Sequence, residues 1–326
     1  MSTPSTSLAT LRPDLGGSFM EYEYAAARSR MIAQEVFPVV EAIKPEGLLG
    51  KIPIEELLKA ANVTRAAGAP YPRAKYTFTK DTYATTDYGI EEVVDDRNAA
   101  MYNLFFAAEQ LAAQRATHTV MVEAEKRVAA AVFDTAAWTG SSLFTNVAVE
   151  WSTVATAVPI TNVEAAAVAV FGNCGMWPNA LIMSRTVFRN LRLVSQVQDL
   201  LKYQGNFGDV KPENLTPQML AGVFDVDKII VGGAAKNTAA SGAAASISEV
   251  WDDEYCMVAK VATTDDLREP CIGRIIHWGE DGSTIGTTLE SYRDEPARAD
   301  IVRARHDVDE KRLYVEAGHL LGNIMA

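Results

Sequence analysis

The longest stretch of helix-forming residues in this chain runs from Arg97 to Phe133 without a proline or a glycine. It follows an acidic pair, Asp95 and Asp96, which suits a helix N-terminus because carboxylates interact favourably with the helix dipole there. A continuous helix over these residues would span roughly 55 Å at 1.5 Å per residue. Charged residues inside the stretch exclude a membrane span, and no heptad repeat supports a coiled coil. We therefore expect a long strut along which a mostly β body lies.

Composition limits the classes of protein that the chain can belong to. Its 326 residues are enough for a large core and predict two linked domains. The net charge of −12 argues against a DNA-binding surface as the main function, because phosphate binding needs clustered Lys and Arg, but not against enclosing nucleic acid. Three widely spaced cysteines predict reduced thiols. No apolar segment predicts a signal peptide or a membrane span.

The first 94 residues contain little that could form a core of its own. Residues 1–48 predict a long arm with an amphipathic segment, 19–36, that ends at Pro38. Residues 49–94 predict a long hairpin with strands at 76–79 and 83–86. A two-stranded hairpin is barely stable alone, so we expect it to lie on a neighbouring chain. The alternative is a surface hairpin folded back on its own domain.

The segment between the long helix and residue 261 predicts a β-containing connection (135–160) followed by a small α/β or α+β domain. Helices are predicted at 163–171 with Asn162 as its cap, at 185–203 with Ser184 as its cap, and at 217–223 after Thr216. Strands are predicted at 179–183, 228–231 and 255–261, and residues 235–248 read as a long loop.

The last quarter predicts an antiparallel β region that packs on the 97–133 helix. Its strands are expected at 272–278, 284–292, 301–305 and 313–317, with residues 306–311 as a polar turn between the last two.

No motif in the chain predicts chemistry. Gly232, Gly233 and Lys236 lack the spacing of a phosphate loop, and the four histidines are scattered. The acidic pairs Asp225/Asp227 and Asp307/Asp309 lack the further ligands of a calcium loop and read as solvated turns. We therefore predict no catalytic residue, no cofactor and no metal, and interpret the chain as a non-enzymatic building block.

The order of these parts and several short segments resemble the major capsid proteins of tailed bacteriophages with the HK97 fold. Residues 50–55 resemble the start of that family's E-loop, and residues 93–97 its return into the spine helix. Residues 179–184, and residues 230–239 followed by Val250 and Trp251, are similar to strands and the A-loop of the axial (A) domain. The closing strands resemble the peripheral (P) domain.

The resemblance implies an α+β, HK97-like fold divided into an N-terminal arm (1–48), an E-loop (49–94), a P domain with the spine helix (95–160), an A domain with the A-loop (161–265) and P-domain strands (266–326). It implies hexamers and pentamers that tile an icosahedral shell around double-stranded DNA without sequence-specific binding. It further implies a scaffolding protein, a portal protein and a decoration protein as partners, assembly in the host cytoplasm, and a final place in the virion capsid. Inter-subunit contacts are then expected at Lys51, Ile52, Ile54, Tyr71, Tyr76, Phe78, Tyr83, Phe19, Tyr22 and Tyr24.

Two other functions remain open at this point. An encapsulin-type nanocompartment shell would keep the fold and enclose a cargo enzyme instead of DNA; a cargo gene nearby, in place of terminase and portal genes, would mark it. An enzyme with an unrecognised site would show a deep polar pocket within residues 162–261.

Overall fold

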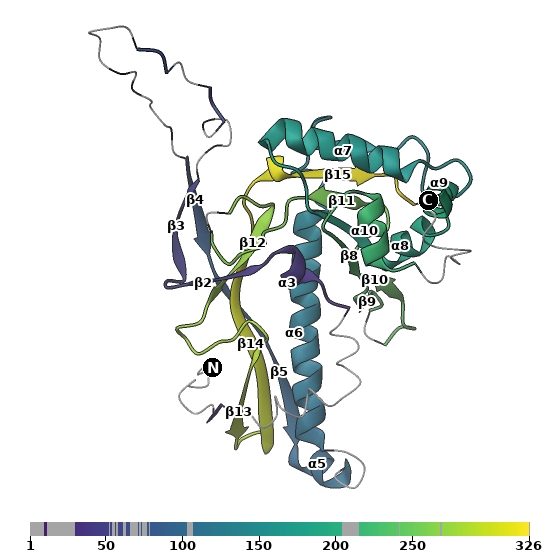
Figure 1. Cartoon of the computed structure of the whole chain (residues 1–326). Coiled ribbons are helices and arrows are strands. Elements are labelled where there is room, and N and C mark those ends of the chain that lie inside the picture. Colours follow the sequence, from purple (N-terminus) through teal and green to yellow (C-terminus); the bar gives the residue numbers. More distant parts are fainter. Residues whose placement is uncertain are drawn as a thin grey trace.

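A computed structural model describes residues 10–11, 30–51, 79–102, 107–203, 215–240, 242–267 and 269–325, together with scattered positions between 53 and 77. Within the described residues, the strands form two larger sheets and two two-stranded ladders, and one long helix lies beside the first sheet (Figure 1). None of the described helices is both long enough and apolar enough to cross a membrane.

The first sheet is built around β14 (Ala299–Arg312). One edge of β14 pairs with β13 (Thr288–Asp294) and β12 (Gly273–Trp278), and the other pairs along ten residues with β5 (Thr86–Asp95). β2 (Val39–Ala42) joins β12 in parallel, and β1 (Thr10–Leu11) joins β13. The pairings are otherwise antiparallel, as predicted for the end of the chain.

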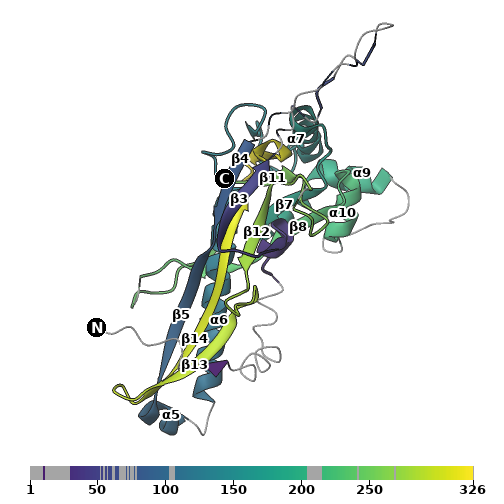
Figure 2. The same cartoon turned by 90° about the vertical axis from the view of Figure 1, so that its left-hand side faces the viewer.

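The long helix α6 (Ala108–Val132) packs along β14 and β5, and Figure 2 shows the helix and the strands side by side. Small residues of α6, Ala112, Ala113 and Ala116, meet Val302 and Ala304 of β14. Short side chains on both surfaces let the helix backbone approach the sheet closely. The predicted strut beside a β region is therefore confirmed.

The prediction of one continuous helix from residue 97 to residue 133 is wrong. The structure has a short α5 (Asp96–Tyr102) and then α6, whose 25 residues span roughly 37 Å. Residues 103–106 lie outside the described residues, and Ala107 before α6 is extended, with ψ 107°. The acidic pair lies at a helix N-terminus as predicted, and Asp95 Oδ1 also accepts from the amides of Arg97 and Asn98 at 2.9 and 3.2 Å.

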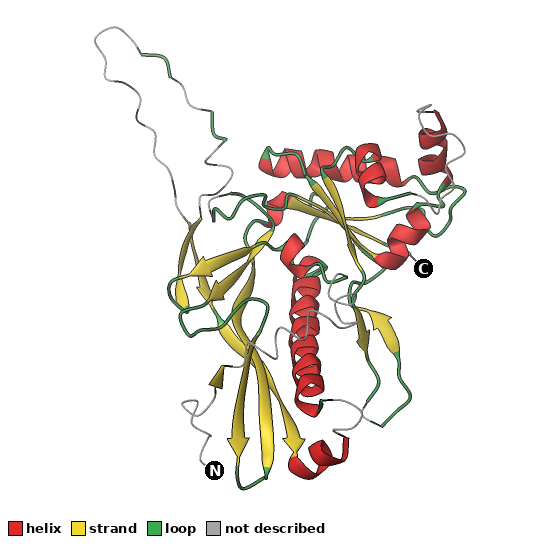
Figure 3. Ribbon diagram, turned by 60° about the horizontal axis from the view of Figure 1, so that its bottom comes forward, coloured by secondary structure: helices red, strands yellow, loops and turns green. Residues whose placement is uncertain are grey.

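The second sheet has the order β6 (Phe144–Asn146), β15 (Gly318–Gly322), β11 (Cys256–Ala259), β7 (Ala180–Ser184) and β8 (Lys228–Gly232). Four helices belong with it: α7 (Pro159–Cys174), α8 (Arg185–Leu191), α9 (Ser195–Tyr203) and α10 (Pro217–Val223) (Figure 3). The sheet thus includes β6 and β15, from segments that the resemblance assigned to the P domain. That the predicted domain boundaries separate independently folding units stays a prediction.

Several local predictions in this region are confirmed and two are wrong. Ser184 Oγ and Thr216 Oγ1 cap α8 and α10 as expected. The predicted helix 185–203 instead breaks into α8 and α9, because the chain tightens into i→i−3 bonds at Leu193 and Val194 and buries Val194. Helix α7 starts at Pro159 rather than after Asn162, since a proline at the first helical position needs no amide partner.

Three further predictions in the second half of the chain are wrong. Residues 235–248 are not only a loop, because β9 (Ala235–Asn237) and β10 (Ile247–Glu249) form a ladder. Residues 313–317 form no strand and include the short 3₁₀ helix η3 (Val315–Ala317). The predicted polar turn 306–311 is the continuous second half of β14. There, His306 and Val308 face the helix side while Asp307 and Asp309 face the other side, a period-2 pattern that marks a strand despite its charge.

The side chain of Glu125, in the middle of α6, is buried and joins three distant segments. Its carboxylate accepts from the amides of Ile32 and Ala33 at 2.8 and 2.9 Å, at the start of α3 (Ala33–Val36). It also accepts from Trp251 Nε1 at 2.6 Å. Burial raises the pKa of Glu125, and these three hydrogen bonds oppose that shift.

We expect Glu125→Ala to lower the free energy of unfolding by about 3 kcal/mol, because three buried donors lose their acceptor. Glu123→Ala, two residues earlier on the exposed side of the same helix, removes only a surface pair with Lys126 and should cost under about 1 kcal/mol. Urea unfolding of both variants measures the difference. Equal losses of unfolding free energy in the two variants would contradict the role of Glu125 in joining these segments.

A pH effect follows from His306, whose ring is buried where Arg127 Nη2 donates to Nε2 at 3.2 Å. Burial and then the Arg127 charge lower the pKa of His306 to about 4. Folding therefore disfavours the charged ring, so the stabilisation is complete above the unfolded pKa of about 6.5 and is lost as the pH falls toward 4.

We expect the wild type to lose on the order of 2 kcal/mol more than His306→Gln between pH 7.5 and pH 5. The measurement is the unfolding free energy of both proteins across that range. His118→Gln serves as a comparison, because His118 lies on α6 and burial lowers its pKa as well. Parallel pH curves for wild type and His306→Gln would contradict the assignment.

Candidate functional site

The segment between β3 (Glu46–Lys51) and β4 (Thr79–Ala84), residues 52–78, is called the excursion below. The two strands pair antiparallel, with Lys51 opposite Thr79 at the end of the ladder. Figure 1 shows the ladder at the end of the first sheet opposite to β13. The predicted hairpin therefore has a paired base, but the predicted strands 76–79 and 83–86 are wrong in their bounds. The ladder pairs β3 with β4, and residues 86–95 belong to β5 of the first sheet.

The base of the excursion is attached to its own chain by two lysines. Lys51 Nζ donates to the carbonyl of Leu313 and lies 4.3 Å from the ring centroid of Tyr314. Lys311 of β14 pairs with Asp81 at 2.7 Å, and its charge lowers the pKa of that carboxyl. These contacts fix the direction in which the excursion leaves the sheet.

The ten predicted contact residues are only partly visible. Tyr71 is 70% exposed and lies 4.7 Å from the Arg65 guanidinium, while half-buried Tyr83 donates to the carbonyl of Lys44 at 3.2 Å. Lys51 is bonded within its own chain, as above. The others lie outside the described residues: Ile52, Ile54, Tyr76, Phe78, Phe19, Tyr22 and Tyr24. Their role between subunits stays a prediction.

Large apolar side chains are exposed at several separate places. Ile43 beside the ladder is 84% exposed, Val63 of the excursion 83%, and Ile247 of β10 75%. Phe171 and Trp177 stack on each other at the end of α7, with ring centroids 4.6 Å apart, and both remain exposed. Apolar side chains scattered singly over a surface are ordinary in folded proteins, so these positions by themselves do not identify an interface.

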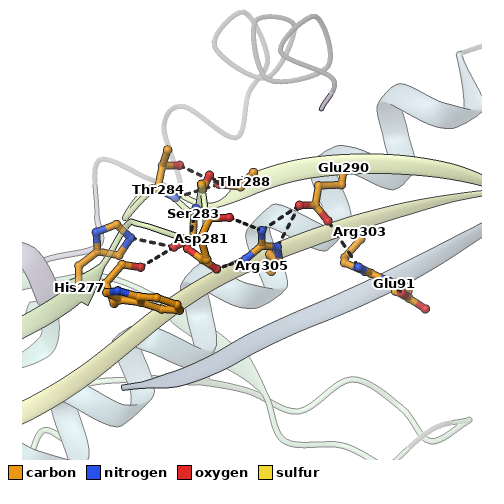
Figure 4. A network of polar contacts seen from close by, with 11 residues as sticks. Glu91, His277, Asp281, Ser283, Thr284, Thr288, Glu290, Arg303 and Arg305 are labelled. Carbon is orange, nitrogen blue, oxygen red and sulfur yellow. Dashed lines mark hydrogen bonds and ion pairs between the residues drawn. The ribbon is translucent and has the colours of Figure 1, made fainter. Parts of the chain in front are cut away.

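The face of the first sheet turned away from α6 carries a network of charges (Figure 4). Arg303 of β14 bonds to Glu91 on β5 at 2.7 Å and to Glu290 on β13 at 3.5 Å. Arg305 bonds to Glu290 at 2.9 Å and to one carboxylate oxygen of Asp281. The other oxygen of Asp281 accepts from the amide of Ser283. Both guanidiniums are therefore already engaged by carboxylates from three different strands and loops.

Next to this network two aspartates oppose each other. Asp87 of β5 and Asp307 of β14 are direct partners in the ladder. Asp307 is only 7% exposed, and its buried Oδ1 has no hydrogen-bond partner. Burial raises the pKa of Asp87; Arg305 lowers it, while the charges of Asp307 and Asp281 raise it further. Like charges directly opposite in a ladder are destabilising, and the nearby charges of Arg305 and Arg303 oppose that repulsion at Asp87.

The sequence reasoning missed this charged face because one sequence does not show which of its many charged residues pair in space, and because it read residues 306–311, which include Asp307, as a turn. The signal was present in the alternation of β14, where Val302, Ala304 and Val308 are separated by charged residues. Counting that period of two over the whole stretch, instead of its polarity, would have predicted the strand.

The metal-binding groups and the cysteine thiols of the described residues offer no reactive centre. No group of three His, Cys, Asp or Glu side chains there could hold a metal ion. The three cysteines are unpaired and buried, and burial raises the pKa of each thiol, which makes them poor nucleophiles. The described arrangement is suited to contacts between surfaces.

Comparison with known proteins gives one clear sequence likeness. No protein-family model matches the chain. The chain is 26% identical over 211 residues to a protein named major capsid protein from Burkholderia phage BcepMu. The match covers 63% of this chain and 64% of that protein, so it spans just under two thirds of the relative's length.

Solved structures match over nearly the whole chain. A phage-related protein from Bordetella bronchiseptica RB50 gives a TM-score of 0.69 at 21% identity and covers 97% of this chain and 98% of its own. The capsid protein of Cyanophage P-SCSP1u gives a TM-score of 0.58 at 10% identity over 88% of this chain and 86% of its own. The predicted α+β class and fold are thereby confirmed, and the chain has the HK97-like fold of phage major capsid proteins.

Proposed function

We propose that this chain is a structural coat protein that self-assembles into hexamers and pentamers of an icosahedral phage head, enclosing double-stranded DNA. The observation that carries the proposal is the excursion: a segment on a fixed two-stranded base, with exposed Val63 and Tyr71, on a chain whose fold is that of phage capsid proteins. Side chains of this kind gain burial worth roughly 25 cal/mol per Å² only when another copy covers them.

The partners follow from the same role. Copies of the chain itself are the main partner, with a scaffolding protein, a portal protein and a decoration protein as further ones, and the virion capsid as the location after assembly in the host cytoplasm. The net charge of −12 supports a shell that encloses DNA without binding it tightly. Sequence likeness to a phage protein favours this role over a nanocompartment shell and over an enzyme, and the described residues hold no group of side chains that could bind a metal ion.

The proposal predicts that purified chain forms rings or closed shells, and that removing the excursion abolishes them. Residues 52–78 can be replaced by Asn-Gly, because Lys51 and Thr79 face each other and a two-residue turn closes such a ladder. We expect the shortened protein to keep its secondary structure and remain a soluble subunit. Electron microscopy and light scattering measure assembly, and circular dichroism checks folding.

Two results would count against the proposal. The first is a monodisperse wild-type subunit that forms no rings or shells under any condition in which it stays folded. The second is normal shells from the shortened protein. Genes beside the coding gene then distinguish the two shell roles, since terminase and portal genes belong to a phage head and a cargo gene to a nanocompartment.

A further inference from the structure

A pocket of about 120 Å³ lies between α3, the middle of α6 and strands β12 and β14 of the first sheet (Figure 1). Most of its lining residues are apolar, among them Met31, Met121, Ile275 and Val308. An apolar cavity of roughly 150 Å³ is enough to hold a benzene-sized molecule. The pocket, called the inner pocket below, therefore has the size and the surface of a site for one small molecule.

The two carboxylates that line the inner pocket already have partners. Glu125 accepts the three hydrogen bonds described above. Glu310 accepts from Arg127 Nε at 3.0 Å and from Arg127 Nη2 at 2.7 Å. A cation in the pocket would have to compete with these buried hydrogen bonds, so we expect an uncharged occupant.

His306 also lines the pocket, and its hydrogen bonding is incomplete. Its Nε2 must be the acceptor in the contact with Arg127 at 3.2 Å, because a guanidinium can only donate. In the neutral ring the proton is then on Nδ1, which is buried and has no hydrogen-bond partner among the described residues. The backbone of Ile285 affects the pKa of the ring but forms no hydrogen bond with Nδ1. An acceptor brought by an occupant would satisfy this donor.

The wall of the inner pocket can adjust to the shape of an occupant. Met31 and Met121 are only half-buried there, and methionine side chains change rotamer easily and fit irregular apolar shapes. A volume of about 120 Å³ admits one ring or a short branched chain and is too small for a segment of polypeptide. Size therefore favours a small molecule over part of another protein chain.

We propose that the inner pocket binds a small, uncharged and mostly apolar molecule with one hydrogen-bond acceptor, such as a ketone oxygen, which accepts from Nδ1 of His306. A molecule of this size contacts α3 and α6 at once, because both helices line the pocket. Its binding therefore strengthens the attachment of residues 33–36 to the long helix. The inference concerns a single subunit and does not depend on the proposed shell function.

Two probes of the same shape test the role of His306. Cyclohexanone carries one acceptor, and methylenecyclohexane has the same ring without it. Dissociation constants for the purified chain follow from the rise of the thermal unfolding midpoint with probe concentration. We expect both probes to bind the wild type. His306→Phe keeps a ring but removes the donor, so it should weaken cyclohexanone binding about fivefold more than methylenecyclohexane binding, the effect of one ordinary hydrogen bond.

A pair of matched variants locates the bound probe. Ala124→Leu fills part of the inner pocket and should weaken the binding of both probes about tenfold, because the added side chain occupies their place. Ala130→Leu adds the same volume at an exposed position of α6 outside the pocket and should leave binding unchanged. In the wild type, cyclohexanone should also slow hydrogen exchange at the amides of residues 32–37, measured by mass spectrometry, because these amides lie where α3 meets α6.

Three results would overturn the proposal. The first is an unfolding midpoint that neither probe changes, which is the result expected of a pocket that takes up only water. The second is an equal effect of His306→Phe on the binding of the two probes, which would remove the hydrogen bond from the argument. The third is equal binding to the Ala124→Leu and Ala130→Leu proteins, which would place the probes elsewhere on the chain. This last comparison decides the matter even where His306→Phe does not fold.

Discussion

The packing of β14 against α6 is the contact on which the rest of the structure depends. A fourteen-residue strand has two faces, and around residues 302–305 one face is apolar and the other is charged. Val302 and Ala304 close against the small residues of α6, which fixes the strand to the helix. Arg303, Arg305 and Asp307 then project to the opposite side. The same interaction that forms the core therefore also presents a charged surface to whatever lies outside the sheet.

Glu125 extends this packing into the second sheet and the first described helix. A carboxylate with three buried donors holds α3 and Trp251 at one point of α6, so segments far apart in sequence are positioned by one side chain. Trp251 follows the β9–β10 ladder by two residues, and α3 follows residues 1–29 of the arm. Movement of either segment is thereby coupled to the middle of the long helix, because a lost partner would leave a buried charge or a buried donor unsatisfied.

Structural features that depend on residues close in sequence could be predicted from the sequence. The caps at Ser184 and Thr216 and the apolar strand β7 depend on neighbours within a few residues, and they were predicted correctly. The break at residues 192–194 was not, because residues with good helix propensity yield there to tertiary packing. Residues 306–311 were mistaken for a turn because their polar groups have partners elsewhere in the chain: Arg127 of α6 beside His306 and Glu310, and Asp81 beside Lys311. The charged network was for this reason invisible to a reading of polarity alone.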